Sequence, residues 1–286
     1  NQIQFVYQQL LLALGDGLVI FCSQYWGKKQ TGPMKKIAVI AMYAAIFIAV
    51  VLFGLVSFFP YQAVGIFTTD EPIIEAGVSY LNVIRFTYLF FAITQILLAT
   101  MRSVETVKIA FQLSVMTFFV NCGINYVLIF GHFGAPELGI VGAAIGTLTA
   151  RIMEIIVLIF YIKKKDKKLQ IRLSDYFSLD KQLAKDYTKI TAPMVFTQGL
   201  WGVNTALQTA ILGHMTATAI AANSAASTLF LLMKSTAVGA ASTASIIIGK
   251  AIGVGDIEQV KSYAKRLQRL FIVIAAISSS PAYARG

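Results

Sequence analysis

A few polar and charged side chains interrupt long apolar stretches of the sequence, and these residues could bind an ion or a ligand. Asp16 lies between Gly15 and Gly17 in the stretch 3–25. A carboxylate in so apolar a segment is costly to bury, which makes it a candidate for carrying a proton or meeting a cationic compound. A structural salt bridge to a cation such as Arg85 is the alternative.

Two amides occur in the uncharged stretch 109–130. Asn121 and Asn125 are four residues apart, so they share one face of a helix. Buried amides must find hydrogen-bond partners. They are expected either to bind a neighbouring helix as a structural contact or to act directly in a cavity, and the sequence leaves both open.

A polar stripe is predicted on the later stretch 190–212. Gln198, Trp201, Asn204 and Gln208 recur there at intervals of three or four residues. Three amides and one indole on one helix face could line a wide substrate cavity. A packing seam between helices is the alternative.

Three charges in other apolar stretches admit a structural explanation. Arg151 and Glu154 are three residues apart on one helix face and are expected to pair with each other. Lys234 is the one charge within 219–249. It would discriminate between substrates or take part in coupling if it faced a cavity, or it would extend toward the membrane surface.

The elements that carry these residues are predicted to be transmembrane helices. The composition is 57% hydrophobic and 13% charged, with a mean hydropathy of +0.72, whereas soluble domains carry roughly 25% charged residues. The net charge of +11 falls in short clusters between apolar spans, a pattern of cytoplasmic loops that argues against nucleic acid as a partner. No nucleophile with a base, phosphate loop or metal cluster indicates an enzyme, and no cofactor or metal site is expected.

About seven transmembrane helices and part of an eighth are expected, because a span needs roughly 20 mostly apolar residues. The predicted fold class is therefore an all-α integral membrane protein. The expected spans cover 3–25, 37–59, 77–101, 109–130, 138–162, 190–212 and 219–249, followed by a cut-short span at 257–277.

The orientation follows from the lysines and arginines. Four segments (26–36, 102–108, 163–189 and 249–269) contain 20 of the 24, and the loops that alternate with them contain none. Basic loops are cytoplasmic in multi-pass proteins, so the first span is expected to run from outside to inside.

The lysine-rich segment 163–189 is predicted to link an amino-terminal lobe, 1–162, to a partial carboxy-terminal lobe, 190–286. The first and seventh spans end alike, because Gln24 and Lys250 each lie three residues before a glycine at the inner face. Two copies in the same orientation predict paired lobes with a substrate cavity between them. A six-helix repeat would make the chain truncated at both ends.

Several motifs, in order across five spans, resemble the multidrug and toxic compound extrusion (MATE) family of secondary transporters. They are Gln24-Tyr-Trp-Gly27-Lys-Lys, Tyr80-Leu81 ahead of Met101-Arg102-Ser103, Asn121-x-x-x-Asn125-Tyr-Val-Leu-Ile-Phe-Gly131, Pro136-x-Leu-Gly139-Ile-x-Gly142-Ala-Ala, and Arg151.

This resemblance implies a twelve-helix fold of two pseudo-symmetric six-helix lobes, of which this chain would hold helices two to eight and part of nine. It also implies an antiporter that exports small organic, often cationic, compounds in exchange for Na⁺ or H⁺. Such a protein is expected to be a lipid-embedded monomer of the plasma membrane.

The resemblance further implies a coupling site formed by an acid on helix one, an Asn and an acid on helix five, and a Thr on helix six. The matching positions are Asn121, Asn125 and Thr147. Asn125 stands where the family has an acid, and helix one is absent from this sequence. A second acid of the sodium-coupled branch would fall near Trp201, so a carboxy-terminal cation site is not expected.

Two other functions remain open. A lipid-linked saccharide flippase of the same superfamily would carry several cationic residues along its cavity, for which Arg85, Arg151 and Lys234 are the candidates. A non-transporting membrane scaffold or channel is the other possibility, and flux measurements would separate these functions.

Overall fold

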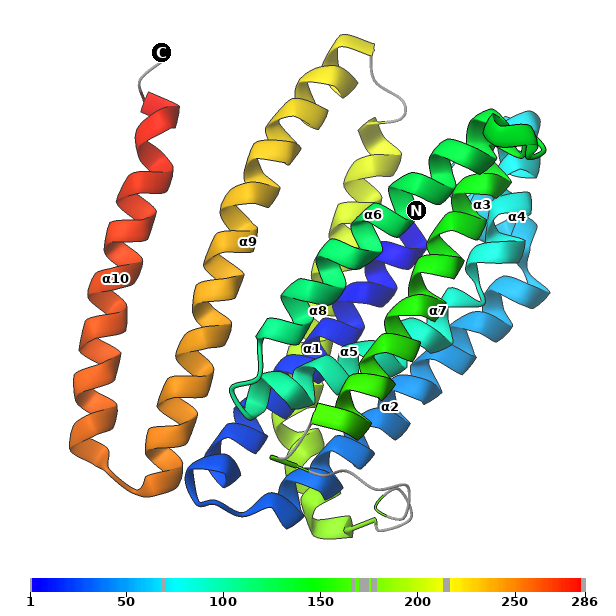
Figure 1. Ribbon diagram of the computed structural model, residues 1–286. Coiled ribbons are helices and arrows are strands. Elements are labelled where there is room, and N and C mark those ends of the chain that lie inside the picture. Colours follow the sequence, from blue (N-terminus) through cyan, green and yellow to red (C-terminus); the bar gives the residue numbers. More distant parts are fainter. Residues whose placement is uncertain are drawn as a thin grey trace.

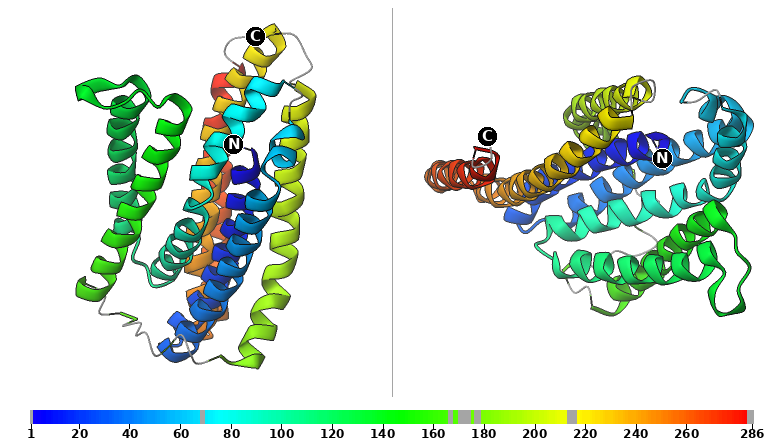
Figure 2. Two further views of the ribbon diagram at one scale, coloured as in Figure 1. Left: turned by 90° about the vertical axis from the view of Figure 1, so that its right-hand side faces the viewer. Right: turned by 90° about the horizontal axis from the view of Figure 1, so that it is seen from above.

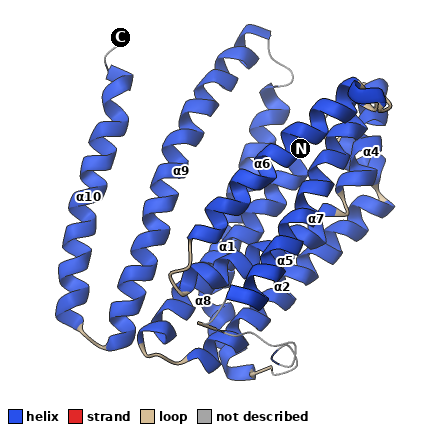
Figure 3. Cartoon of the chain, in the orientation of Figure 1, coloured by secondary structure: helices blue, strands red, loops and turns tan. Residues whose placement is uncertain are grey.

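The computed structural model describes residues 2–67, 70–165, 168–169, 175, 179–212 and 217–283. Within these ranges every regular element is a helix (Figure 3). Helices are the expected result, because lipid offers no partner for a backbone N–H or C=O and a helix satisfies these groups within one segment.

The described residues form eight long helical segments when the bent pair α4–α5 is counted as one. This agrees with the predicted all-α membrane fold (Figure 1). Five helices are long and apolar enough to cross a membrane, and the bent pair α4–α5 makes a sixth span. The elements are α1 (Gln2–Gly27), α2 (Thr31–Phe58), α3 (Pro60–Gly65), α4 (Glu71–Ile84), α5 (Thr87–Ser103), α6 (Lys108–Phe130), the short 3₁₀ turn η1 (His132–Gly134), α7 (Gly139–Lys165), α8 (Lys181–Leu212), α9 (Ala217–Val254) and α10 (Ile257–Tyr283).

Helix α1 occupies the centre of the molecule. It packs against α2, α5, α8 and α9, which surround it when the molecule is viewed along the helices (Figure 2). Leu11, Leu18 and Cys22 on α1 are fully buried. The Tyr7 hydroxyl donates a hydrogen bond of 2.6 Å to the Tyr88 carbonyl oxygen. Side chains that α1 carries are therefore placed where several other helices meet.

The span predicted at 77–101 is not one straight helix. It consists of α4 and α5, which meet at an angle of 51°. At the bend, the Thr87 hydroxyl donates to the Ile84 carbonyl at 2.6 Å, and a hydroxyl that bonds back to the backbone commonly bends a helix. The Arg85 guanidinium lies 5.7 Å from the Phe53 ring centre and 5.3 Å from that of Phe86.

Helix α8 begins earlier than the predicted span at 190. The Asp180 carboxylate accepts hydrogen bonds from the backbone N–H groups of Gln182 and Leu183, at 3.1 and 3.3 Å, and thereby caps the helix at Lys181. The Leu183 N–H and the nearby Lys36 ammonium lower the pKa of Asp180. The segment 181–189 is thus the first part of α8, and residues 166–167, 170–174 and 176–178 of the expected linker lie outside the described residues.

The basic segments meet at one end of the bundle. Lys168 lies 5.8 Å from the Trp26 ring at the end of α1, and Lys35 forms an ion pair of 3.2 Å with Asp175. We call this end the inner end. The common position of these segments agrees with the orientation that the distribution of lysine and arginine predicts.

Candidate functional site

The two amides on α6 form a hydrogen-bonded chain with α7. Asn125 Nδ2 donates to Asn121 Oδ1 at 2.9 Å, and Asn121 Nδ2 donates to Thr147 Oγ1 at 3.2 Å. Thr147 Oγ1 in turn donates to the Ala143 carbonyl at 3.1 Å. The amides therefore bind a neighbouring helix, which is one of the two possibilities that the sequence left open.

One acceptor in this hydrogen-bonded series receives no hydrogen bond from the described part of the chain. Asn125 Oδ1 is buried and has no hydrogen-bond partner among the described residues. An ideal Cβ on Gly146 would collide with this oxygen, so the glycine on α7 makes room for it. Buried acceptors are normally satisfied. A cation could therefore be bound here by amide and hydroxyl oxygens, whereas these neutral groups have no carboxyl to take up a proton.

Asp16 pairs with a different arginine from the one expected. Its Oδ1 lies 3.6 Å from Arg102 Nη2, and Arg102 Nη1 donates to Ser242 Oγ on α9 at 3.4 Å. The expected partner Arg85 lies against aromatic rings instead. Asp16 and Arg102 side chains are 32% and 24% exposed, so this ion pair is accessible from one side. The pair joins α1, α5 and α9.

The remaining predicted ion pair is present on α7. Arg151 Nη1 lies 2.6 Å from Glu154 Oε2, and the Arg151 guanidinium also lies 4.8 Å from the Phe91 ring centre. Glu154 is buried, with 5% of its surface exposed. Each charge is therefore compensated within the fold, and the expected pairing is confirmed.

Of the residues in the predicted polar stripe on α8, Trp201 contacts another candidate residue, Lys234. Lys234 Nζ lies 2.9 Å from the Trp201 ring centre, and Phe5 of α1 lies 5.4 Å from the same indole. Gln198 is half-buried, whereas Asn204 and Gln208 are exposed. The structure thus brings together Trp201 and Lys234, which belong to different helices.

The inner ends of α1 and α9 cross in close contact. An ideal Cβ on Gly27 would meet the Lys250 carbonyl oxygen, and one on Gly253 would meet the Gln24 carbonyl oxygen. Small residues at a spacing of four allow backbones to approach in this way. We call this contact the inner crossing, and it consists of Ser23, Gln24 and Gly27 with Gly249, Lys250 and Gly253.

The inner crossing is reciprocal. Ser23, Gln24 and Gly27 correspond to Gly249, Lys250 and Gly253 at a constant separation of 226 residues. Gly27 approaches Lys250 while Gly253 approaches Gln24. Such an exchange of equivalent contacts is the pattern of a local two-fold axis. The sequence indicated that the two segments are copies, but not that the copies touch.

An ion pair borders the inner crossing. Lys250 Nζ lies 2.6 Å from Glu105 Oε1, and the two side chains are 46% and 42% exposed. Glu105 follows α5 in the left-handed backbone conformation, with φ of 60°. Because exposed ion pairs contribute about 0–1 kcal/mol, the close helix packing rather than this pair is expected to dominate the stability of the contact.

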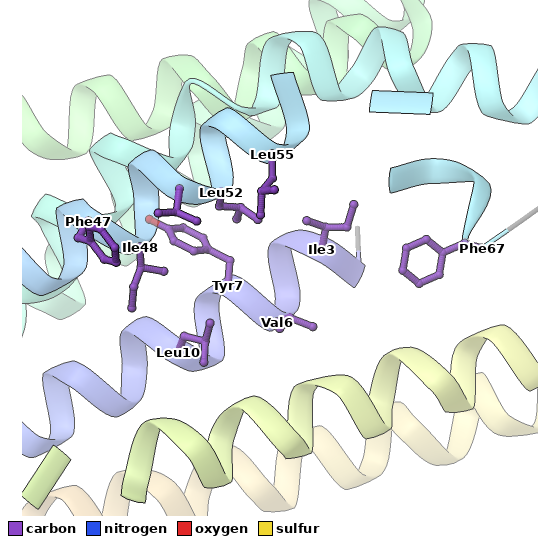
Figure 4. Close-up of a pocket in the computed structure, with 10 residues that line it drawn as sticks. Ile3, Val6, Tyr7, Leu10, Phe47, Ile48, Leu52, Leu55 and Phe67 are labelled. Atoms are coloured by element: carbon purple, nitrogen blue, oxygen red, sulfur yellow. The ribbon is translucent and has the colours of Figure 1, made fainter. Parts of the chain in front are cut away.

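Two cavities lie in the outer half of the bundle. The one between α1 and α2 has a volume of about 380 Å³ and is lined by apolar side chains and Tyr7 (Figure 4). A second, of about 710 Å³, includes Gln4, Tyr80 and Tyr88 in its lining. The Tyr88 hydroxyl has no partner among the described residues. Neither cavity is lined by a charged residue.

Comparison with known proteins places this geometry in context. The MatE family model matches residues 1–127. A probable multidrug resistance protein, YoeA of Bacillus subtilis (strain 168), is 25% identical over 263 residues, which cover 90% of this chain and 56% of the relative. A probable multidrug resistance protein, NorM of Thermotoga maritima, is 29% identical over 168 residues, which cover 58% of this chain and 36% of the relative. The chain spans about half the length of YoeA.

Solved structures share the fold. An outward-facing multidrug resistance MATE family transporter of the MOP superfamily aligns with a TM-score of 0.83 and 16% identity, over 96% of this chain and 60% of that one. A MOP superfamily transporter from Pyrococcus furiosus aligns with a TM-score of 0.78 and 16% identity, over 96% and 60%. The predicted fold class is thereby confirmed.

Proposed function

We propose that this multi-pass membrane protein belongs to the MATE family, and that it is part of an antiporter that exports small organic compounds from the cell. The multidrug resistance names of the relatives support this proposal. In the same proposal the protein is a monomer in the plasma membrane and exchanges its substrate for Na⁺ or H⁺.

The division into lobes is part of the proposal. Residues 1–162 would form one lobe and 190–286 part of the second, joined by the segment 163–189 on the inner side. In transporters built from parallel repeats, the substrate site lies between the two halves, which rock to open on one side and then on the other. The seam between α1 and the pair α8 and α9 would be that interface.

The inner crossing is the observation that best supports alternating access. It joins equivalent segments of the two proposed lobes by backbone contacts at Gly27 and Gly253. Direct backbone contact leaves no passage between α1 and α9 at this level. The structure would therefore represent a state that is closed at the inner end, and separation of the two helices would open it.

A reversible disulfide tests this proposal. An ideal Cβ on Gly249 lies 3.0 Å from Ser23 Cβ, so a small separation of the two helices brings the pair to the distance of about 3.8 Å found in disulfides. In a background with Cys22 and Cys122 replaced by alanine, the pair Ser23→Cys and Gly249→Cys is expected to cross-link on oxidation. Export should stop and should return after reduction.

The control uses the same helix at another position. Gly239 of α9 has no atom within 4 Å of its ideal Cβ, so Ser23→Cys with Gly239→Cys should neither cross-link nor lose export. Export that continues at full rate in completely cross-linked protein would contradict an inner gate at this crossing.

We assign two groups of residues to coupling. Asn121, Asn125 and Thr147 would bind a cation through neutral oxygens, and the unpartnered Asn125 oxygen supports this role. Asp16 is the one carboxylic acid among these four residues and can take up a proton. Its partly exposed side chain supports access of a proton to the carboxylate. Proton uptake by Asp16 would release Arg102 and thus weaken a link between α1 and α5.

Gln198, Trp201, Asn204, Gln208 and Lys234 are proposed to line the substrate path. Trp201 and Lys234 support this assignment most, because Trp201 contacts Lys234 of α9 on one side and Phe5 of α1, across the seam of the proposed lobes, on the other. The amides at Asn204 and Gln208 lie exposed on the same helix.

The alternatives have less support. A flippase cavity would need several free cationic side chains. Of the three candidates, Arg151 is paired with Glu154 and Arg85 lies against two aromatic rings, which leaves Lys234 as the one without an ion pair among the described residues. A channel would conduct without a coupling ion. Dye accumulation in cells that express the protein separates these functions. Lower accumulation of a cationic dye, dependent on a Na⁺ or H⁺ gradient, is expected; retention that does not change when both gradients are collapsed would refute the antiporter.

A further inference from the structure

Lys234 lies too deep in α9 to reach water at either end of its helix. It is close to the middle of Ala217–Val254, so about 25 Å of helix separates it from Ala217 and about 30 Å from Val254, at 1.5 Å per residue. A lysine side chain spans only a fraction of that distance. The position is therefore different from that of a lysine that extends to the membrane surface.

The described contact of the Lys234 ammonium is with an aromatic ring. Its Nζ lies 2.9 Å from the Trp201 ring centre, where the negative face of the indole attracts the ammonium. No hydrogen bond or ion pair to Lys234 occurs among the described residues. The three N–H donors of the ammonium thus have no acceptor in the described part of the chain. The Lys234 and Trp201 side chains are both partly exposed.

Lys234 contacts α8, and its own helix α9 packs against α1 and α10. Asp16 of α1 is already paired with Arg102, and Asp186 of α8 accepts a hydrogen bond from the Gln182 side chain. Lys234 therefore brings a positive charge that no described side chain compensates. The Coulomb interaction with this charge opposes a cationic group beside Lys234 and favours an anionic one.

We propose that Lys234, Trp201 and Phe5 form a subsite for aromatic compounds that carry a carboxylate. The carboxylate accepts hydrogen bonds from the Lys234 ammonium, and the aromatic part packs on the Trp201 and Phe5 side chains, which lie 5.4 Å apart. Gln198 is half-buried and lies three residues before Trp201 on the same helix. The inference rests on the proposed export function and adds aromatic acids and zwitterions to the cationic compounds proposed as its substrates.

Tryptophan fluorescence gives a direct test of binding. The sequence contains two tryptophans, so Trp26→Phe leaves Trp201 as its sole indole. Bromine quenches indole emission at short range. The purified protein with this substitution is titrated with three ligands that share one ring: 4-bromobenzoate, 4-bromobenzamide and 4-bromobenzyltrimethylammonium.

The expected result is saturable quenching by 4-bromobenzoate, with a Kd at least tenfold lower than for the amide or the cation. Lys234→Met should remove this preference, whereas Lys234→Arg should retain most of it. Methionine has a similar length and no charge, so it suits the middle of an apolar helix and is expected to preserve folding. Thermal unfolding of each variant checks this.

Equal quenching by the three ligands, or a preference that survives in Lys234→Met, would overturn the proposal. Quenching that rises without saturation would do the same, because it indicates partition into the detergent. Failure of the export function gives a different outcome: the carboxylate preference would be present, but the protein would not move 4-bromobenzoate across a vesicle membrane under any ion gradient.

Discussion

Gly27 is the position where one added methyl group should most affect the inner end. In Gly27→Ala, the new Cβ would meet the Lys250 carbonyl oxygen and lie 3.1 Å from Gly253 Cα. Both are backbone atoms of α9, which cannot rotate away as a side chain would. Helices α1 and α9 must therefore move apart for the methyl group to fit.

The magnitude follows from this overlap. Overpacking of a tight contact costs about 1–3 kcal/mol. The cost applies to the inner-closed state and is absent when the helices separate. The ratio of inner-closed to inner-open molecules should therefore fall by about 5- to 150-fold. The exposed Lys250 to Glu105 pair, worth about 0–1 kcal/mol, cannot offset this loss.

Cross-linking across the inner crossing measures this ratio. In protein without native cysteines, Glu105→Cys and Lys250→Cys are joined by a short bismaleimide. These positions leave the glycines unchanged and are exposed to the reagent. The rate of cross-linking should fall in Gly27→Ala by a factor that tracks the lost population of the closed state.

Gly123→Ala on α6 is the matched control, because no atom lies within 4 Å of its ideal Cβ. This variant should cross-link at the parent rate. If Gly27→Ala also cross-linked at the parent rate while it remained folded, the close packing at Gly27 would not hold the inner end closed, and our inference from the glycine contacts would be wrong.

Three further predictions concern the charged and amide clusters. Asp16→Asn leaves Arg102 with a neutral partner and should lower thermal stability by about 1 kcal/mol, since the pair is partly exposed; no shift in the melting temperature would contradict a stabilising pair. Gly146→Ala should displace the Asn125 oxygen and abolish any stabilisation by Na⁺ in a thermal-shift assay; an unchanged Na⁺ response would place the ion elsewhere. Asp180→Ala should loosen the first turn of α8 at pH 7, seen as faster amide hydrogen exchange there. Because the pKa of Asp180 is lowered by folding, its stabilisation is present above the unfolded value of about 3.9 and is lost as pH falls through the lower folded value, so the difference between variant and parent should vanish only in strong acid.

The sequence predicted the helices well because their cause is local. A long run of apolar residues in lipid has to satisfy its own backbone, so the spans from Gln2–Gly27 to Ala217–Val254 could be placed from composition. The Arg151 to Glu154 pair was also predictable, since both residues lie on one helix face. The bend between α4 and α5 was missed, because no proline or glycine marks it.

Contacts between side chains of different helices could not be predicted from the sequence. Asp16 had several cations within the apolar stretches, and only the packing of α5 against α1 selected Arg102 over Arg85. Lys234 and Trp201 are on separate helices, and their contact depends on how α8 and α9 are rotated. The sequence did contain one signal for the inner crossing. The small residues Ser23 and Gly27 on α1, and Gly249 and Gly253 on α9, each recur at a spacing of four.

By itself, the sequence determined that this protein is a bundle of membrane-spanning helices, which end carries the basic loops, and that Gln24 and Lys250 occupy equivalent places. Each of these follows from residue type and spacing along one segment. The tertiary structure decided which equivalent residues meet, which carboxylate neutralises which cation, and that Lys234 lies over the Trp201 ring. Those outcomes depend on the rotation and approach of helices far apart in the chain, and small residues such as Gly27 and Gly253 set that approach.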